Sequence, residues 1–186
     1  EPLSEPLLHW FIHSLTRAAL RIFFVMTDAT VNLQGQKILI VDDLVEARSA
    51  LKSMLTVLGA DDIYTATDGR EAVEFIMEHD FDMVLSDYNL GKGKDGQQIL
   101  EEARYTNRLR ATATFVMITG ENAVDRVMGA LEYDPDAYIT KPFTLSILRE
   151  RLYRLRMLKN ILQPVNKAID LGEIDWAIEL ADQVMK

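Results

Sequence analysis

The chain has 186 residues, which suits one domain of ordinary size with extensions, or one and a half domains. Hydrophobic residues make up 48% and charged residues 26%, as in a globular protein with a sizeable core. The net charge of −9 argues against a protein that coats nucleic acid, which needs clustered Lys and Arg. The absence of cysteine excludes disulfides and cysteine-ligated zinc, and it is compatible with the cytoplasmic location that we expect.

Residues 1–34 form an N-terminal extension. Arg17 and Arg21 argue against a membrane-spanning helix in this segment, and no small-residue cleavage site follows it. Apolar residues recur at steps of three and four, as in an amphipathic helix: Leu8, Phe11, Leu15, Ala19, Ile22 and Met26. Two interpretations stay open. The segment is an amphipathic helix that covers the domain, a second copy or a membrane surface, or it is a leader upstream of a natural start at Met26.

From Lys37 onward, short apolar runs alternate with stretches of helical periodicity. The run Lys37–Val41 is continuous and β-branched, as in a strand buried on both faces. Further strands are predicted at Ile63–Thr67, Met83–Ser86, Thr114–Ile118 and Ala137–Thr140. Helices are predicted at Leu44–Leu58, Arg70–Glu78, Gln97–Tyr105 and Asn122–Leu131, and a long fifth helix starts after Pro142. We therefore expect an α/β fold: a five-stranded, doubly wound parallel sheet with flanking helices at both ends.

Polar side chains stand at the carboxyl ends of these predicted strands. Asp42 and Asp43 follow the first strand, Asp87 the third, Thr119 the fourth and Lys141 the fifth. Parallel strands end at one edge of a sheet, where the functional crevice of such folds lies. Three carboxylates repel one another unless a cation neutralises them, and Mg²⁺ prefers such oxygen ligands. A hydroxyl and an ammonium group complete a cradle for phosphoryl oxygens, so the pattern indicates phosphoryl transfer to Asp87 as nucleophile.

Four segments, KILIVDD, DMVLSDYNL, FVMITGEN and AYITKPF, resemble the signature segments of the response-regulator receiver family, in the same order and spacing. The resemblance covers roughly Lys37 to Met157. It implies a flavodoxin-like receiver fold and a phosphoacceptor of a two-component system. Such a protein accepts a phosphoryl group from a histidine kinase in a Mg²⁺-dependent reaction and then switches protein–protein interactions. It is a signalling domain that catalyses only its own phosphorylation and dephosphorylation, not an enzyme in the usual sense.

The resemblance also implies the metal ligands and the phosphoacceptor. Asp87 would accept the phosphoryl group. Asp43 and Asp87 would bind Mg²⁺ directly, together with the backbone carbonyl of Asn89. Asp42 would act on the ion mainly through water.

Further roles follow from the same resemblance. Thr119 and Lys141 would bind phosphoryl oxygens, and Thr119 would form a switch with Tyr138, which turns inward after phosphorylation. The peptide bond before Pro142 would be cis. Two residues would tune the lifetime of the phosphoryl group: Asn89 and Glu121.

The chain departs from the family pattern in two places. After Asp87, Gly91 stands where a Pro is usual, and Gly96 comes nine residues on, so that the loop NLGKGKDG is one residue longer than usual. The segment Asp134–Ala137 replaces the usual Gly-Ala pair before the fifth strand. Neither change removes a chemical group from the site, but the first bears on loop rigidity and kinase docking.

The predicted partners are a sensor histidine kinase or phosphotransfer protein, and a downstream protein bound through the fourth and fifth helices or through C-terminal repeats. Basic residues are spread round the last receiver helix, which favours a solvated face or salt bridges in a dimer: Arg149, Arg151, Arg154, Arg156 and Lys159. A homodimer therefore stays open, and we expect no direct binding of nucleic acid.

The C-terminal part differs from the rest. We expect a receiver domain at 35–159 and a helical fragment at 160–186, because Gln163–Pro164 is predicted to interrupt the long helix. Residues 168–180 (AIDLGEIDWAIEL) resemble the centre of a tetratricopeptide repeat, with Gly172 at the turn between two helices. Since one repeat cannot bury its own face, we expect a longer natural protein. Alternatively, two short helices pad the receiver or a dimer interface.

Two other functions share part of this pattern. An aspartyl-nucleophile hydrolase also uses a strand-end Asp with a Thr and a Lys, but such enzymes carry a second Asp as general acid, where this chain has Asn89. A receiver-shaped scaffold that binds partners without phosphorylation would not need all five polar groups at the strand ends.

Overall fold

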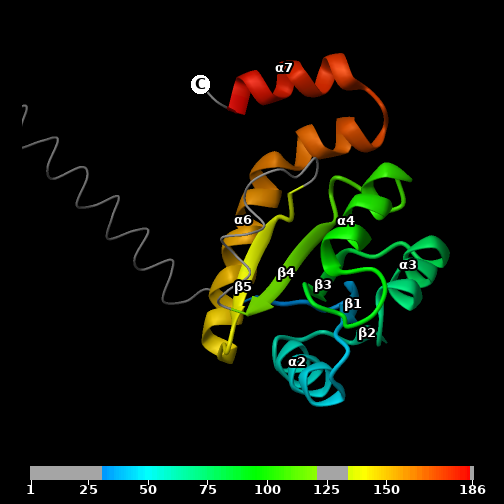
Figure 1. Ribbon diagram of the computed structural model, residues 1–186. Coiled ribbons are helices and arrows are strands. Elements are labelled where there is room, and N and C mark those ends of the chain that lie inside the picture. Colours follow the sequence, from blue (N-terminus) through cyan, green and yellow to red (C-terminus); the bar gives the residue numbers. More distant parts are fainter. Residues whose placement is uncertain (1–30, 121–133, 185–186) are drawn as a thin grey trace, which may run out of the picture. The chain divides into compact units, whose positions relative to one another are not determined.

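The computed structural model describes residues 31–120 and 134–184 (Figure 1). The predicted N-terminal amphipathic helix, the predicted helix at Asn122–Leu131 and Glu121 therefore lie outside the described residues. Within the described residues, no helix has the length and apolar character needed to cross a membrane.

Five parallel strands form one sheet in the order β2-β1-β3-β4-β5. The strands are β1 (Lys37–Val41), β2 (Asp62–Ala66), β3 (Met83–Asp87), β4 (Thr114–Gly120) and β5 (Ala137–Lys141). The strand order reverses between β1 and β3, and this reversal places the crevice of a doubly wound sheet at their carboxyl ends. The predicted α/β fold with a parallel five-stranded sheet is confirmed.

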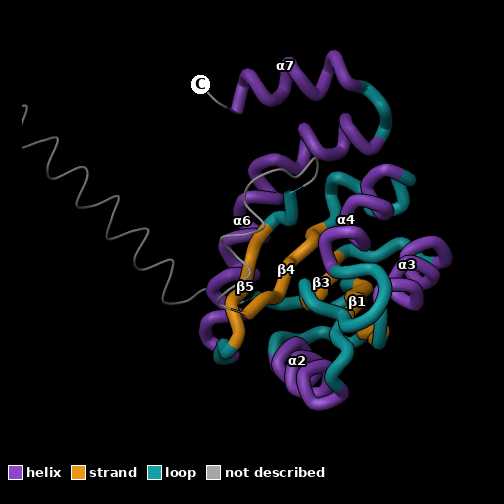
Figure 2. The backbone as a smooth tube through the Cα atoms, in the orientation of Figure 1, coloured by secondary structure: helices purple, strands orange, loops and turns teal. Residues whose placement is uncertain are grey.

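Helices cover both faces of this sheet (Figure 2). They are α2 (Val45–Val57), α3 (Gly69–Glu78), α4 (Gly96–Tyr105) and α6 (Leu145–Asp170), whereas α7 (Ile174–Val184) packs against α6. Along β1, Ile38 and Ile40 pack with α2 and α6, whereas Leu39 and Val41 pack with α3 and α4. Alternate residues of a strand point to opposite faces, so the continuous apolar run predicted for β1 belongs to a strand buried on both sides.

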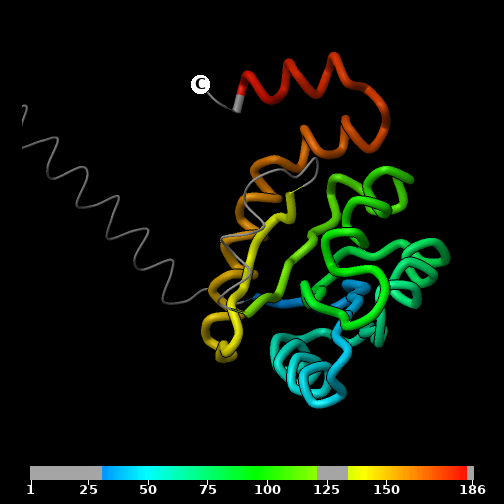
Figure 3. The backbone as a smooth tube through the Cα atoms, in the orientation of Figure 1, coloured from blue at the N-terminus to red at the C-terminus, as the bar shows by residue number. Residues whose placement is uncertain are grey.

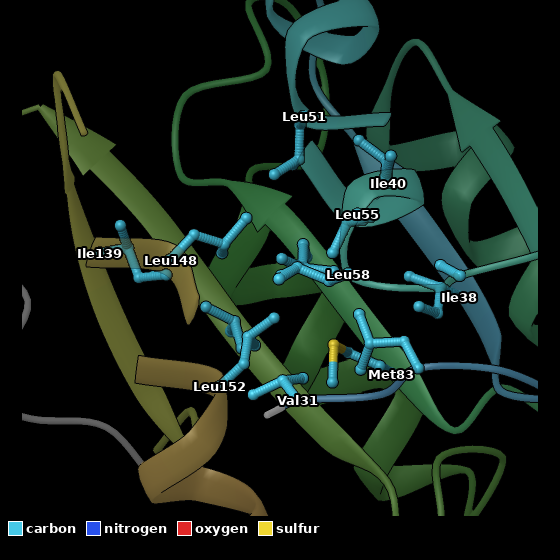
Figure 4. Close-up of a cluster of buried hydrophobic side chains, with 14 of the residues drawn as sticks. Val31, Ile38, Ile40, Leu51, Leu55, Leu58, Met83, Ile139, Leu148 and Leu152 are labelled. Carbon is cyan, nitrogen blue, oxygen red and sulfur yellow. The ribbon is translucent and has the colours of Figure 1, made fainter. Parts of the chain in front are cut away.

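The core on the α2 and α6 face joins residues that are far apart in the sequence (Figure 4). Leu51 and Leu55 of α2 lie in the same buried cluster as Leu148 and Leu152 of α6, and Ile139 of β5 belongs to it as well. Burying an aliphatic side chain of this size contributes about 1.5–3 kcal/mol. The packing in this cluster therefore stabilises the position of the first half of α6 against the sheet.

Side-chain caps begin three of the helices where the sequence predicted a helix start to within one or two residues. Asp68 accepts hydrogen bonds from two backbone N–H groups at the start of α3, and Asp95 forms a capping box with Gln98 at the start of α4. The hydroxyl of Thr144 accepts a hydrogen bond from the N–H of Ile147 in the first turn of α6.

The predicted interruption of the long helix at Gln163–Pro164 is wrong. Helix α6 runs unbroken from Leu145 to Asp170 with Pro164 inside it. A proline inside a helix removes one hydrogen bond and crowds the preceding turn, and it commonly bends the helix. The axis of α6 changes direction along its length (Figure 3). Contacts beyond the proline offset its cost: Ala168 is buried, and the Asp170 carboxylate accepts a hydrogen bond of 2.5 Å from the N–H of Ala111.

Helix α7 returns beside the second half of α6 after a tight turn. Gly172 has a φ of +75° in this turn, a conformation that glycine adopts without strain. It was predicted to lie at the turn between two helices, and it does. The predicted domain boundary at residue 159 lies within α6. The tetratricopeptide-like character of this hairpin stays a prediction.

Candidate functional site

The carboxyl ends of β1 and β3 bring two buried carboxylates together. Asp42 follows β1 directly, and Asp87 is the last residue of β3. Both are at most 9% exposed. Since β1 and β3 are neighbours in register, with Val41 opposite Ser86, the residues that follow these positions end at the same edge of the sheet.

A third carboxylate completes a potential metal site. Asp42, Asp43 and Asp87 each offer an oxygen, and the three oxygens lie within 4.8 Å of one another. Asp43 is exposed to solvent, whereas the other two are buried. Carboxylate oxygens open to water on one side are the ligand set that suits Mg²⁺, which keeps several of its own water molecules. The chemistry of these donors therefore fits the predicted ion.

Lys141 is the cation that the described residues place among these carboxylates. Its Nζ atom donates to Oδ2 of Asp42 at 2.7 Å and to Oδ2 of Asp87 at 2.9 Å. Burial would lower the pKa of Lys141, but its hydrogen bonds to Asp42 and Asp87 and their charges outweigh burial and raise it. Lys141 therefore stays charged at neutral pH. The Lys141–Pro142 peptide bond is cis, as predicted.

Burial dominates the electrostatics of Asp87. It raises the pKa of this carboxyl above its ordinary value, and the charge of Asp42 acts in the same direction. The hydrogen bond and charge of Lys141, together with the backbone N–H of Asn89, oppose the shift without cancelling it. The three carboxylates and the ammonium group of Lys141 leave the cluster with a net negative charge, to which a further cation would be attracted.

The sequence reasoning missed a residue that holds Asp42 in place. Arg48, at the start of α2, donates from a guanidinium nitrogen to the backbone carbonyl of Asp42 at 2.6 Å. Oδ1 of Asp42 accepts from the N–H of Leu44 at 3.0 Å, which turns the chain into α2. An Arg in the first turn of the helix that follows an Asp pair was the available signal.

Thr119 and Tyr138 lie on the adjacent strands β4 and β5, Thr119 near the carboxyl end of β4 and Tyr138 near the start of β5. Thr119 was expected just after its strand but lies inside β4, where it is buried and its hydroxyl donates to the carbonyl of Gly120 at 3.2 Å. Tyr138 of β5 is opposite Met117 and half-buried against the α3 and α4 side of the core. Burial raises the pKa of Tyr138, and the charges of Asp134 and Tyr88 add to the shift.

The loop between β3 and α4 lies tightly against the site. A Cβ on Gly96 would fall 2.4 Å from the carbonyl oxygen of Asp87 and 2.8 Å from Sδ of Met117, so only glycine fits there. Gly91 has a φ of +72°, and a Cβ on it would lie 3.6 Å from Asp43. Proline cannot adopt this φ. The glycine in place of the usual proline is therefore a requirement of this longer loop.

Comparisons with known proteins agree with this geometry. The family described as "Response regulator receiver domain" matches residues 38–153. The chemotaxis protein CheY-3 of Vibrio cholerae is 34% identical over 122 residues, which is 66% of this chain and 92% of that protein. The aerobic respiration control protein ArcA of Escherichia coli is 36% identical over 143 residues, which is 76% of this chain and 53% of that protein.

Solved structures show the same fold. The chemotaxis response regulator CheY4 of Vibrio cholerae has a TM-score of 0.58 and 26% identity, covering 64% of this chain and 98% of that one. The receiver domain of the sensor histidine kinase PA1611 from Pseudomonas aeruginosa has a TM-score of 0.56 and 27% identity, covering 65% of this chain and 97% of that one. That structure contains a magnesium ion coordinated in the active-site cleft.

Proposed function

Because the chain belongs to the response regulator receiver domain family, we propose that it is the phosphoacceptor of a two-component system. Asp87 accepts a phosphoryl group from a sensor histidine kinase or a phosphotransfer protein in a Mg²⁺-dependent reaction. The observation that carries the proposal is the convergence of Asp42, Asp43 and Asp87 around one point, with Lys141 bridging two of them.

In the transfer step, a carboxylate oxygen of Asp87 forms a bond to phosphorus while the bond from phosphorus to the donor nitrogen breaks. The electron pair of that bond leaves with the donor imidazole. A bound Mg²⁺ would supply positive charge for the phosphoryl oxygens, held by Asp43, Asp87 and the carbonyl of Asn89, with Asp42 acting mainly through water. Burial raises the pKa of Asp87, and the charges of Lys141 and of a bound cation favour the carboxylate form that attacks phosphorus.

After the transfer, Lys141 and Thr119 bind oxygens of the phosphoryl group on Asp87. The ammonium group of Lys141 already contacts the Asp87 carboxylate, so it pairs with a phosphoryl oxygen after a small displacement. The Thr119 hydroxyl turns from the Gly120 carbonyl to another phosphoryl oxygen. Tyr138 then moves inward on the neighbouring strand, and Thr119 and Tyr138 together act as the switch. Asn89 and Glu121 tune how long the phosphoryl group persists.

Phosphorylation shifts a two-state equilibrium. The new group carries about −1.5 to −2 charges at neutral pH, and it favours the state in which Thr119 and Lys141 close on it. Downstream proteins sense the change through the fourth and fifth predicted helices, the fifth of which is α6, or through the C-terminal helices. We place the reaction in the cytoplasm. The chain catalyses only its own phosphorylation and dephosphorylation, since Asn89 offers no general acid for turnover.

The test is phosphorylation by a small donor. Incubation with acetyl phosphate and Mg²⁺ should add one phosphoryl group to the intact protein, as measured by mass spectrometry, and EDTA should prevent it. Asp87→Asn should abolish the adduct. Asp82→Asn is the matched control, because Asp82 lies at the opposite end of β3, where its carboxylate accepts from the N–H of Lys37. An adduct that persists in Asp87→Asn, or none on the wild type, would contradict the proposal.

A further inference from the structure

Helix α6 carries a second stripe of residues beside the one that packs on the sheet. Members recur at steps of three and four: Ile147, Arg151, Arg154, Leu158, Ile161, Val165 and Ala168. Such spacing places them along one side of a helix, as in the seam of a coiled coil. The core stripe of α6, which contains Leu148, Leu152 and Leu155, is a separate one.

Only the far end of this second stripe is covered. Ala168 is 3% exposed where α7 returns, and the N–H of Glu173 donates to its carbonyl at 2.9 Å. Leu158 and Ile161 are 50% and 55% exposed, and Arg151 and Arg154 are exposed as well. The part of the stripe from Arg151 to Ile161 is therefore an apolar and basic surface that faces solvent.

Helix α7 does not cover this surface in its own copy, since Leu158 and Ile161 are half exposed. It has 11 residues and extends about 16 Å, so even a helix laid along α6 from Ala168 would reach no further than about residue 158. Arg151 and Arg154 lie one to two turns beyond that point. Arg154 contacts Glu150 at 2.5 Å in an exposed pair, which contributes little to stability because water screens it.

The exposed side of α7 complements this surface in charge and in apolar character. Ile174 and Ile178 are 54% and 57% exposed and lie one turn apart, and Asp182 follows one turn further. Asp175 and Glu179 flank them on the exposed side of the helix. Between Ile174 and Val184 the helix contains three acidic residues and no basic one.

We propose that this surface is a homodimer interface, in which α7 of each copy lies antiparallel against residues 151–161 of α6 of the other. The two stripes match in length: Ile174 to Asp182 spans about 12 Å, and Ile161 to Arg154 spans about 10 Å. Ile174 and Ile178 then meet Ile161 and Leu158, while Asp182 meets Arg154. In this arrangement α6 of each copy binds α7 of the other copy. A single two-fold axis therefore forms both contacts and leaves no binding surface for a third copy.

Charge reversal tests this pairing in the full chain. The wild type should have the mass of a dimer in sedimentation velocity over a wide concentration range. R151E/R154E on α6 should be monomeric, since its new acidic groups face the acidic α7 of the other copy. E179R/D182R on α7 should be monomeric for the reciprocal reason. R70E/E74R on α3 is the matched control, with a reversed exposed pair away from the surface, and should remain dimeric.

Mixing the two monomeric variants is the decisive step. In the mixed dimer both contacts join opposite charges, so equal amounts of the two should form a heterodimer. Its formation also shows that both variants are folded, which their far-UV circular dichroism and thermal transitions should confirm. A wild type that is monomeric at every concentration, variants that stay dimeric, or a mixture of monomers that fails to associate would each overturn the proposal.

Discussion

Lys141 occupies the space between two of the carboxylates that would hold a metal ion. Its ammonium group lies 2.7 Å from Asp42 and 2.9 Å from Asp87. The positive charge of Lys141, which would attract phosphoryl oxygens, should therefore repel a divalent cation. Its ammonium group also competes with the ion for the same carboxylate oxygens. We therefore expect Lys141 to make the site less attractive to Mg²⁺ alone and more attractive to Mg²⁺ together with an anionic phosphodonor.

Replacing Lys141 by Met should consequently tighten the binding of Mg²⁺ alone. We expect a free-energy gain of about 1 kcal/mol, or roughly fivefold in Kd, as for a partly screened ion pair. Isothermal titration calorimetry measures it. Lys52→Met, which removes an exposed charge on α2, should leave the Kd unchanged. An equal or weaker affinity in Lys141→Met would show that the ammonium group does not compete with the ion.

Gly96 is the residue whose substitution should disturb the site most through packing. A methyl group there would overlap the Asp87 carbonyl oxygen and Met117, so we expect Gly96→Ala to destabilise the fold by about 1–3 kcal/mol. Gly120→Ala is the control, since nothing lies within 4 Å of its Cβ position, and it should change stability by less than about 0.5 kcal/mol. Urea unfolding compares the two, and equal effects would refute this account of Gly96.

At the residue scale, position in the chain predicted which groups gather but not how they bond. Asp42, Asp43, Asp87 and Lys141 were identified because each stands at the carboxyl end of a buried parallel strand, and the topology brings such ends together. The bridging bonds of Lys141 and the support from Arg48 depend on side-chain conformations set by other strands and helices. No local pattern contains that information.

Among the elements, α6 is where local rules and the folded structure disagree. A proline is a strong local signal for a helix end, yet α6 continues through Pro164 because the residues after it make tertiary contacts. Asp170 binds the N–H groups of Ala111 and Thr112, and Ala168 is buried. Strands and capped helices such as α3 and α4 were predictable, since periodicity and capping residues act within a few positions. Tertiary contacts that offset the cost of a proline are not predictable from such short-range patterns.

Replacing Pro164 by Ala should therefore strengthen α6. The substitution restores a backbone N–H and removes the ring, a gain of up to about 3 kcal/mol. The loss of proline also raises the conformational entropy of the unfolded chain, which costs about 0.4–1 kcal/mol. The expected net stabilisation is therefore about 1–2 kcal/mol. Amide exchange at Ala168 and thermal denaturation measure it. Gln163→Ala should change stability by only a few tenths of a kcal/mol, about the difference in helix propensity. A net loss in Pro164→Ala would mean that the bend at the proline is itself required.

For the whole molecule, a metal site formed by residues from separate strands links ion binding to folding. The unfolded chain does not hold Asp43 near Asp87, so Mg²⁺ should stabilise only the folded state. At a concentration one hundred times Kd the stabilisation should be about 2.7 kcal/mol, seen as a higher midpoint of thermal unfolding that EDTA reverses. Asp43→Asn should lose this increase. Asp80→Asn, an exposed site before β3, should keep it, and an equal response in both variants would contradict the assigned ligands.

We propose that phosphorylation of this chain forms an acyl phosphate on Asp87, which reductive trapping can locate to a single residue. Borohydride cleaves an aspartyl phosphate and leaves homoserine at that position, which peptide mass spectrometry identifies. After treatment with acetyl phosphate and Mg²⁺, we expect homoserine at position 87 and unmodified Asp42 and Asp43. Homoserine at another position, or none in a protein that carries a phosphoryl group, would contradict it.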